Sequence, residues 1–373
     1  MSKLNLGSVI LGERRYQSLV LFGLQERTFL RLLALFLVLS AVLYPYPRLA
    51  MWLGFMLAGY SAIANDSIQT IGTFISSNSE QKWWKLWLYI GGIFVVTVFY
   101  SWIVYDGDVT YQRLSSPEFS ESPTSFHFLQ IAAPIVLLLL TRLKMPVSTT
   151  FMLISCFSAS SSGIFSVTQK SLFGYGVAFV VAMVVWYALS GIIKRITSGT
   201  PHPAWRISQW LISGWLWSMW ITHDAANIAI FLNRKLTTID FVIFASFIFF
   251  GLGLLFYLRG DKIQKIITEK SDTEDVRSAS IIDIVYLFVL FVFKEWSNIP
   301  MSTTWVFLGL IGGRELAMQF SKNSETNRSV TQTLKMIGRD ILFATIGLLV
   351  SVSIAIAVNP SIQKELAVYF GWE

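Results

Sequence analysis

The chain has 373 residues, of which 54% are hydrophobic and only 14% are charged. Soluble domains carry about 25% charged residues, so this composition indicates a membrane protein and excludes an ordinary soluble domain. The net charge of +7 lies mostly in short loops between apolar segments, which argues against binding of nucleic acid. The single cysteine, Cys156, cannot form an internal disulfide, and the three widely spaced histidines do not form a structural metal motif.

Eleven apolar segments follow one another along the chain, most of them near the length of about 20 residues that a transmembrane helix needs. They predict an all-α polytopic membrane protein. Two segments are too long for one plain crossing and carry polar residues in the middle, which predicts broken or re-entrant helices at 49–78 and 206–233. The segments lie at 28–45, 49–78, 86–105, 126–143, 147–166, 173–193, 206–233, 240–258, 281–297, 301–317 and 338–358.

The basic residues between these segments predict the orientation of the chain. Residues 1–26 are too polar for a cleavable signal, so the first apolar segment is expected to remain as a helix. If successive loops alternate sides, most basic loops, including 259–279, share the side of the N-terminus. We therefore predict an integral, multi-pass protein of the plasma or inner membrane with a cytoplasmic N-terminus. The basic residues on the opposite side are Arg48, Arg113, Lys170, Arg234, Lys235 and Lys294.

Two polar motifs occur once in each half of the chain. The first reads A-N-D-S-I-Q at 64–69 and T-H-D-A-A-N at 222–227, and the second reads P-x-S-T-T at 146–150 and 300–304. Five predicted crossings separate equivalent points, and because five is odd, the halves are expected to be inverted, as in many secondary transporters. The predicted parts are a tail with the first helix at 1–48, repeat one at 49–193, repeat two at 206–358 and a C-terminal tail at 359–373.

The Asp motifs place one carboxylate inside each of two apolar segments. A carboxylate near the bilayer centre costs about 2.5–3.5 kcal/mol on insertion scales, so it persists where a cation, a proton or water compensates it. Amide and hydroxyl oxygens accompany each Asp, and such oxygens suit a hard cation such as Na⁺. The alternative is a carboxylate that pairs with an arginine or caps a half-helix. The predicted cation ligands are Asn65, Asp66, Gln69, Thr73, Asp224 and Asn227, with Na⁺ placed among Asn65, Asp66, Asp224 and Asn227.

The P-x-S-T-T motifs predict helix N-termini inside the membrane. Proline favours the first turn of a helix, and serine or threonine caps its free N–H groups. A helix N-terminus is positive and attracts anions, and the hydroxyl groups add neutral donors. Plain helix capping is the alternative interpretation. The predicted oxyanion ligands are Asp66, Ser148, Thr149, Thr150, Asp224, Ser302, Thr303 and Thr304.

Cation ligands and oxyanion ligands that converge at one interface favour a cation-coupled anion symporter. The chain has no Walker G-x-x-x-x-G-K-[ST] motif, so a gradient of Na⁺ or H⁺ is the expected energy source, with no other cofactor. His223 fits either a proton relay or a hydrogen-bonded interior histidine. An intramembrane enzyme or a sensor is a weaker alternative, because neighbouring residues such as His223 and Asp224 point about 100° apart on a helix and make a poor catalytic pair.

At these motifs the sequence resembles the inorganic phosphate transporter (PiT) family, which carries a G-A-N-D-V-A-N-type signature and a P-[VI]-S-T-T-type motif in each inverted half. The resemblance covers roughly 49–193 and 206–358. It implies phosphate and Na⁺ or H⁺ sites formed by the matched residues, and a homodimer. The sequence departs from the family pattern at Gln69, Phe151, His223, Ile230, Phe231 and Trp305.

The choice of oxyanion rests on hydrogen-bonding chemistry. At pH 7 phosphate donates hydrogen bonds, whereas sulfate only accepts them, so ionised Asp66 and Asp224 favour phosphate. Sulfate or another small oxyanion is the alternative substrate. The resulting prediction is a symporter of inorganic phosphate driven by Na⁺ or H⁺.

Overall fold

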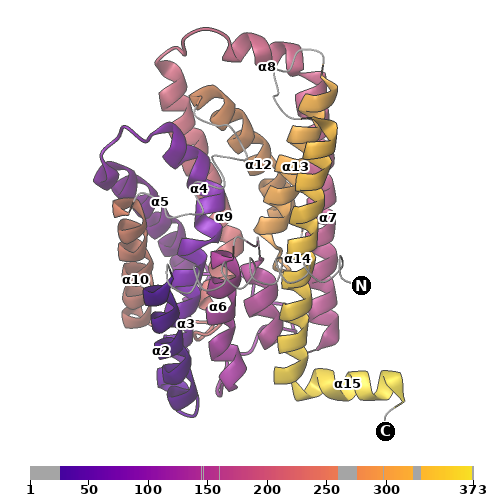
Figure 1. The fold of residues 1–373 in the computed structure, drawn as a ribbon. Helices are drawn as coiled ribbons and strands as arrows, with labels where there is room; N and C mark the ends of the chain where they lie inside the picture. The colour runs from indigo at the N-terminus through magenta and orange to yellow at the C-terminus, as the bar shows by residue number, and fades with distance from the viewer. Residues whose placement is uncertain are drawn as a thin grey trace, which may run out of the picture.

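A computed structural model describes residues 26–371 except 144, 146, 159, 259–274, 297 and 322–328. Pro146, residues 1–25 of the predicted N-terminal tail and most of the loop 259–279 therefore lie outside the described residues. The described residues are all-α and contain no strand. In chain order the elements are α2 (Arg27–Leu43), α3 (Pro47–Ala64), α4 (Asp66–Ser77), α5 (Trp83–Val104), α6 (Phe128–Arg142), the π-helical turn η1 (Thr150–Ile154), the 3₁₀ turn η2 (Ser155–Phe157), α7 (Ser161–Ala188), α8 (Ser190–Thr197), α9 (Ala204–Ala229), α10 (Thr238–Tyr257), α12 (Val276–Trp296), α13 (Thr303–Phe320), α14 (Val330–Val358) and α15 (Pro360–Phe370) (Figure 1).

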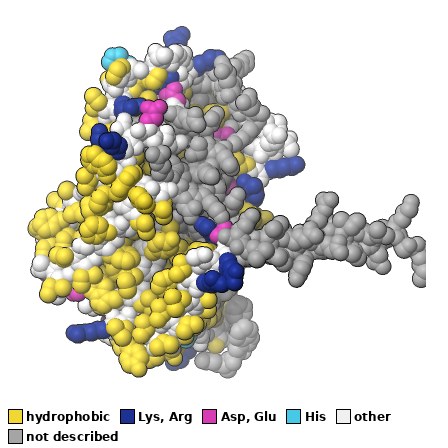
Figure 2. All heavy atoms as spheres, turned by 60° about the vertical axis from the view of Figure 1, so that its left-hand side comes forward, with side chains coloured by type: hydrophobic (Ala, Val, Ile, Leu, Met, Phe, Trp, Pro, Cys, Tyr) yellow, Lys and Arg dark blue, Asp and Glu magenta, His cyan; other side chains and the backbone are white. Residues whose placement is uncertain are grey.

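Five of the described helices, α5, α7, α10, α12 and α14, are long and apolar enough to cross a membrane. Large apolar side chains stay exposed on the outside of the bundle, as at Val96 (69%), Phe250 (64%) and Leu349 (62%). Water disfavours such exposure and lipid favours it. Figure 2 shows a broad area of hydrophobic side chains on one face, with most Lys and Arg side chains around its margin. These features are those of an integral multi-pass membrane protein; its orientation stays a prediction.

Helices α8 and α15 mark the two ends of the molecule (Figure 1). α8 follows α7 and carries the exposed basic residues Lys194 and Arg195. α15 follows α14 after Asn359, whose side-chain oxygen caps the new helix, and Pro360 occupies its first position. We refer to these two regions below as the α8 end and the α15 end.

The first long segment, 49–78, is broken as predicted. α3 ends at Ala64 and α4 begins at Asp66, with Asn65 between them at φ −116° and ψ −70°. The prediction of a second break inside 206–233 is wrong, because α9 continues from Ala204 to Ala229 as one helix. The physical reason lies in the side chains: Asn227 donates to Asp224 one turn earlier on the same helix, so these polar groups interact without an opening of the backbone.

Segments 126–143 and 147–166 form one hairpin rather than the two separate crossings we expected. Gln130 at the start of α6 donates to the carbonyl of Cys156 at 2.9 Å, and the Phe126 and Phe157 rings meet at 6.3 Å. The hairpin therefore begins and ends on the same side, at the α15 end, where Asn359 donates to the Ser158 carbonyl. α6 has 15 residues, about 22 Å, which is short for a bilayer core of about 30 Å.

A second hairpin, α12 and α13, enters from the opposite end. At the start of α12, Arg277 donates to the carbonyls of Ile196, in the last turn of α8, and of Ser198 and Gly199, which follow that helix. α13 then runs in the same direction as α7, because a Cβ on Gly309 would meet Tyr175 and one on Gly313 would meet Phe179. α13 therefore ends near the C-terminus of α7, at the α8 end. The tips of the two hairpins face each other inside the molecule.

The contacts between helices come in corresponding pairs. Replacing each helix of a contact by the equivalent helix of the other half gives the second contact of the pair. α3 contacts α6 as α9 contacts α12, and α5 contacts α9 as α10 contacts α3. η1 packs on α14, the last long helix of the second half, as α13 packs on α7, the last long helix of the first. The two halves are therefore interlocked. The boundaries 49–193 and 206–358 stay a prediction.

Candidate functional site

Asp66 is the centre of the first polar cluster. It is 2% exposed and accepts from the Asn65 amide at 2.5 Å and from the Thr149 hydroxyl. Thr304, from the other half of the chain, donates to the same carboxylate at 3.5 Å. The Asn65 amide also donates to the Val147 carbonyl at 3.2 Å, just before the first triplet. The break between α3 and α4 thus places Asn65 and Asp66 against both Ser-Thr-Thr triplets.

Asp224 lies in a second cluster that is linked to the first. Its Oδ1 accepts from Asn227 at 2.6 Å, and the same amide donates to the Thr150 hydroxyl at 3.1 Å. Thr150 donates in turn to the Met301 carbonyl at 3.3 Å, next to the second triplet. Asn227 therefore joins the second Asp motif to the first triplet, and Thr150 joins the two hairpin tips. All of these side chains are buried.

The two serines of the triplets cap their helical segments. Ser148 accepts from the Phe151 N–H, and Ser302 accepts from the Trp305 N–H, both at 3.2 Å. The capping interpretation thus describes the serines, whereas the threonines of both triplets interact with the Asp motifs: Thr149 and Thr304 with Asp66, Thr150 with Asn227 and Thr303 with Asp224. The Phe151 and Trp305 rings, which follow the two triplets, meet edge to face at 5.4 Å. They form an apolar contact between the hairpins.

Gln69 and Thr73 lie apart from the carboxylate of Asp66. Gln69 donates to the Asn65 side-chain oxygen at 3.4 Å, at the edge of the first cluster. Thr73 instead donates to Asp283 at 2.8 Å, in a separate buried cluster on α12. Sequence reasoning missed Asp283, although a single Asp inside the apolar segment 281–297 was the available signal. It also missed Tyr286, whose hydroxyl donates to the Thr303 carbonyl at 3.1 Å.

Two buried oxygens at Asp224 are unsatisfied. Asn227 Oδ1 has no hydrogen-bond partner within the described residues, and Asp224 Oδ2 has no well-aligned one, the Thr303 hydroxyl being its nearest donor. Buried polar atoms are nearly always paired, so a carboxylate oxygen and an amide oxygen one turn apart fit a cation or a bound donor. His223, by contrast, contacts the Leu290 carbonyl at 2.9 Å through Nε2. This contact corresponds to the interior-histidine interpretation.

Two basic residues that the loop map placed on the wrong side lie beside this site. Arg113 is 1% exposed and donates to the Thr222 carbonyl at 3.2 Å, two residues before Asp224. Burial lowers the pKa of Arg113 to about 10, so the guanidinium stays charged at neutral pH. Lys170 donates to the Ile299 carbonyl at 2.6 Å, just before the second P-x-S-T-T motif. Their positions follow from packing rather than from membrane orientation.

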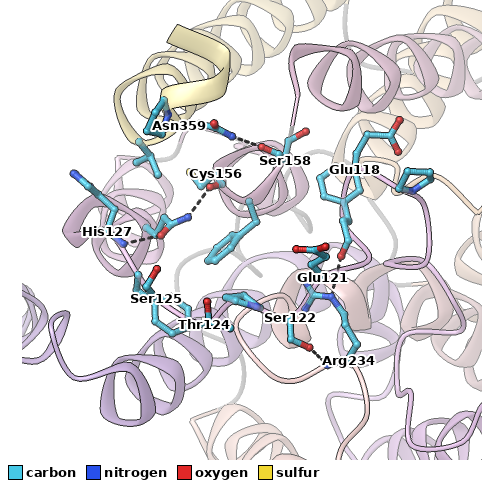
Figure 3. A pocket seen from close by; sticks show the side chains of 18 residues that line it. Glu118, Glu121, Ser122, Thr124, Ser125, His127, Cys156, Ser158, Arg234 and Asn359 are labelled. Carbon is cyan, nitrogen blue, oxygen red and sulfur yellow. Dashed lines mark hydrogen bonds between the residues drawn. The ribbon is translucent and has the colours of Figure 1, made fainter. Parts of the chain in front are cut away.

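An open pocket of about 680 Å³ adjoins the first hairpin at the α15 end. Figure 3 shows Cys156 and Ser158 of the hairpin on one side and Glu121, Ser122 and Arg234 on another. Arg234 is held in place by the Phe119 carbonyl, to which it donates at 2.9 Å. The pocket therefore gives water access to the base of the hairpin that carries the first triplet.

The fold and the site define a class: an all-α, multi-pass membrane protein whose two hairpins enter from opposite ends and meet at a buried polar cluster. Comparison with protein-family models, curated proteins and solved structures finds no match for the chain. A functional conclusion must therefore come from the chain's own residues.

Proposed function

We propose that this chain is a secondary active transporter, a symporter of inorganic phosphate coupled to Na⁺ or H⁺. The observation that carries the proposal is the junction of four motifs that are far apart in the sequence. Thr149 and Thr304 both donate to Asp66, and Asn227 donates to Thr150. A transporter needs such a site, at which one set of ligands comes from both halves.

The arrangement of the hairpins also supports transport. Their tips meet inside the molecule, and the contacts of each helix correspond to those of its equivalent in the other half. Inverted repeats with re-entrant segments are a common plan of secondary transporters, in which one half rocks against the other around a fixed site. The open pocket at the α15 end supplies one route of access to the first hairpin.

The chemistry of the cluster fits a cation together with an oxyanion. Asp66 and Asp224 would hold the coupling cation, since carboxylate and amide oxygens suit a hard ion. The hydroxyls of Thr149, Thr150 and Thr304 and the N-terminus of α13 would hold the oxyanion as neutral donors. The cation offsets the charge of the anion, so the loaded site enters the low-dielectric interior at a smaller cost than either ion alone.

Phosphate is favoured over sulfate by the acceptor atoms at the site. Among the described residues Asn227 Oδ1 is an acceptor without a donor, and Asp224 Oδ2 has no well-aligned donor beside Thr303. A partly protonated phosphate can donate to them, whereas sulfate cannot. The resemblance of the motifs to the PiT family favours the same choice.

The test is uptake of labelled phosphate into proteoliposomes under an imposed Na⁺ or pH gradient. Asp66→Asn and Asp224→Asn are each expected to reduce uptake at least tenfold, because each removes a charge at the cation site. Asp106→Asn is the matched control, since Asp106 is an exposed Asp far from the cluster in sequence and in contacts. Normal uptake in both site variants would overturn the site. No gradient-driven uptake of labelled phosphate by the native chain, with uptake of labelled sulfate in the same assay, would overturn the substrate.

A further inference from the structure

Asp283 forms a third buried carboxylate cluster that none of the repeated motifs predicts. It lies on α12, is 1% exposed, and accepts from Thr73 of α4 at 2.8 Å and from Ser213 of α9. Three helices therefore aim three oxygen-bearing side chains at one point. A carboxylate inside a membrane protein is costly unless a cation, a proton or water compensates it.

This cluster lies between the Asp66 site and the α8 end of the molecule. On α4, polar residues recur every three or four positions, which places Asp66, Gln69, Thr73 and Ser77 on one face of the helix. Beyond Thr73 the polar contacts continue, because Gln209 near the start of α9 donates to Ser77. Asn78, Gln209 and Trp210 then close this row of side chains at the end of α4.

The equivalent positions in the other half are apolar. Thr73 lies seven residues after Asp66, and the residue seven after Asp224 is Phe231. Ser213 lies eleven residues before Asp224, and the residue eleven before Asp66 is Phe55.

Asp283 lies nineteen residues before Ser302 of the second triplet, and the residue nineteen before Ser148 of the first triplet is Leu129. Phe55 and Phe231 are fully buried in the core. The counterparts in the repeat therefore pack well with apolar side chains, so the architecture does not require the carboxylate.

We propose that Asp283, Thr73 and Ser213 form a second Na⁺ site, on the route between the central cluster and the α8 end. The proposal rests on the proposed function, because it assigns this site to the coupling ion. One carboxylate matches one monovalent charge, and the three side chains supply the oxygen ligands that Na⁺ prefers. The two hydroxyls that donate to the carboxylate turn their lone pairs toward the ion when it binds.

The test is thermal unfolding of the purified full-length chain without phosphate, in NaCl or in choline chloride at the same ionic strength. The double variant Asp66→Asn/Asp224→Asn removes the central carboxylates and keeps Asp283. Na⁺ is expected to raise the Tm of this double variant by roughly 3–5 °C, since a ligand that binds only the folded state stabilises it. Adding Asp283→Asn is expected to abolish the rise.

Several outcomes would overturn the site: a rise that survives Asp283→Asn, no rise in the double variant, or stabilisation by low pH but not by Na⁺. If the triple variant does not fold, Thr73→Val added to the double variant takes its place. This variant keeps the carboxylate. It is expected to raise the Na⁺ concentration that gives half of the maximal Tm rise about tenfold, the factor that 1.4 kcal/mol represents. Thr73→Ser, which restores the hydroxyl, is expected to restore the native Na⁺ concentration.

A matched control is Thr97→Val, which removes a buried hydroxyl that contacts Ser218 at 3.0 Å, between α5 and α9. It is expected to leave the Na⁺ dependence unchanged, and an equal effect of Thr97→Val would also overturn the site. Because no phosphate is present, the result stands even if the chain carries another anion. In proteoliposomes, a lower ratio of Na⁺ to phosphate uptake in Asp283→Asn would link the site to coupling.

Discussion

The two hairpins that carry the Ser-Thr-Thr triplets repeat one motif but are built differently. The second triplet opens α13, a regular helix of 18 residues that packs closely against α7. The first triplet leads into a five-residue π-helical turn and a three-residue 3₁₀ turn, which end beside an open pocket. π-Helical turns occur frequently at functional sites. From this difference we expect the second hairpin to be a fixed support and the first hairpin to be the part that opens.

The largest expected effect tests the close packing of the second hairpin. In Gly313→Ala, the new Cβ would lie 2.1 Å from the Phe179 carbonyl oxygen of α7, so the helices must move apart. Overpacking of this kind costs about 3 kcal/mol, and we expect a Tm lower by roughly 5 °C in thermal unfolding. Gly312→Ala is the matched control, because its Cβ would meet only side chains, at 3.5 Å. Equal losses in the two variants would show that α13 is not fixed on α7.

The next effect tests how the second hairpin is anchored at the α8 end. The Arg277 guanidinium binds three backbone carbonyls at and just after the end of α8 and pairs with Asp275 at 2.6 Å. Arg277→Ala removes these charged hydrogen bonds and is expected to cost about 2 kcal/mol of unfolding free energy. Arg195→Ala, an exposed arginine on the neighbouring α8, is expected to have no measurable effect. If Arg195→Ala destabilises the protein as much, the contribution of Arg277 is only its charge.

The sequence predicted most helices because their apolar segments stand out, as α5, α10 and α14 show. It predicted the break at Asn65 because polar residues interrupt an apolar run there. It could not predict the first hairpin, since 126–166 is apolar enough for two crossings. The contacts of Gln130 with Cys156 and of Phe126 with Phe157 show that its ends meet, and the sequence does not reveal them.

The candidate site, like the fold, was predicted from the sequence only in part. The repeated motifs pointed to Asp66, Asp224 and the triplets, and the structure brings these residues together. Asp283 was missed because it has no counterpart in the first half, where Leu129 occupies the equivalent position. A search for repeats finds what the halves share, whereas a site in one half needs the three-dimensional contacts.

A smaller effect measures the mobility of the two hairpins directly. Cys156 is the chain's single cysteine, is buried, and lies eight residues after Ser148, so it reports on opening of the first hairpin. The equivalent residue of the second hairpin is Leu310, also buried. We expect a soluble maleimide to label Cys156 at least about tenfold faster than the new cysteine of a Cys156→Ser/Leu310→Cys variant. Tenfold corresponds to about 1.4 kcal/mol in opening free energy. Equal labelling rates would remove the distinction between the hairpins.

The smallest effect is expected at the surface pair Asp106–Lys235, which joins two loops at the α15 end, beside the first hairpin. Its hydrogen bond to Lys235 holds the pKa of Asp106 below the usual value. A lowered pKa stabilises the folded state above the ordinary pKa of Asp, and this contribution is lost as the pH falls through the folded-state pKa, below about pH 4. Because both side chains are exposed, water and salt screen the pair.

Asp106→Asn is therefore expected to leave the Tm unchanged within error at pH 7, and to leave Cys156 labelling unchanged as well. If it accelerated labelling at pH 7, this ion pair would be a latch on the first hairpin. The mobility of that hairpin would then depend on surface charge. Our expectation is that it follows from the short π-helical and 3₁₀ turns alone.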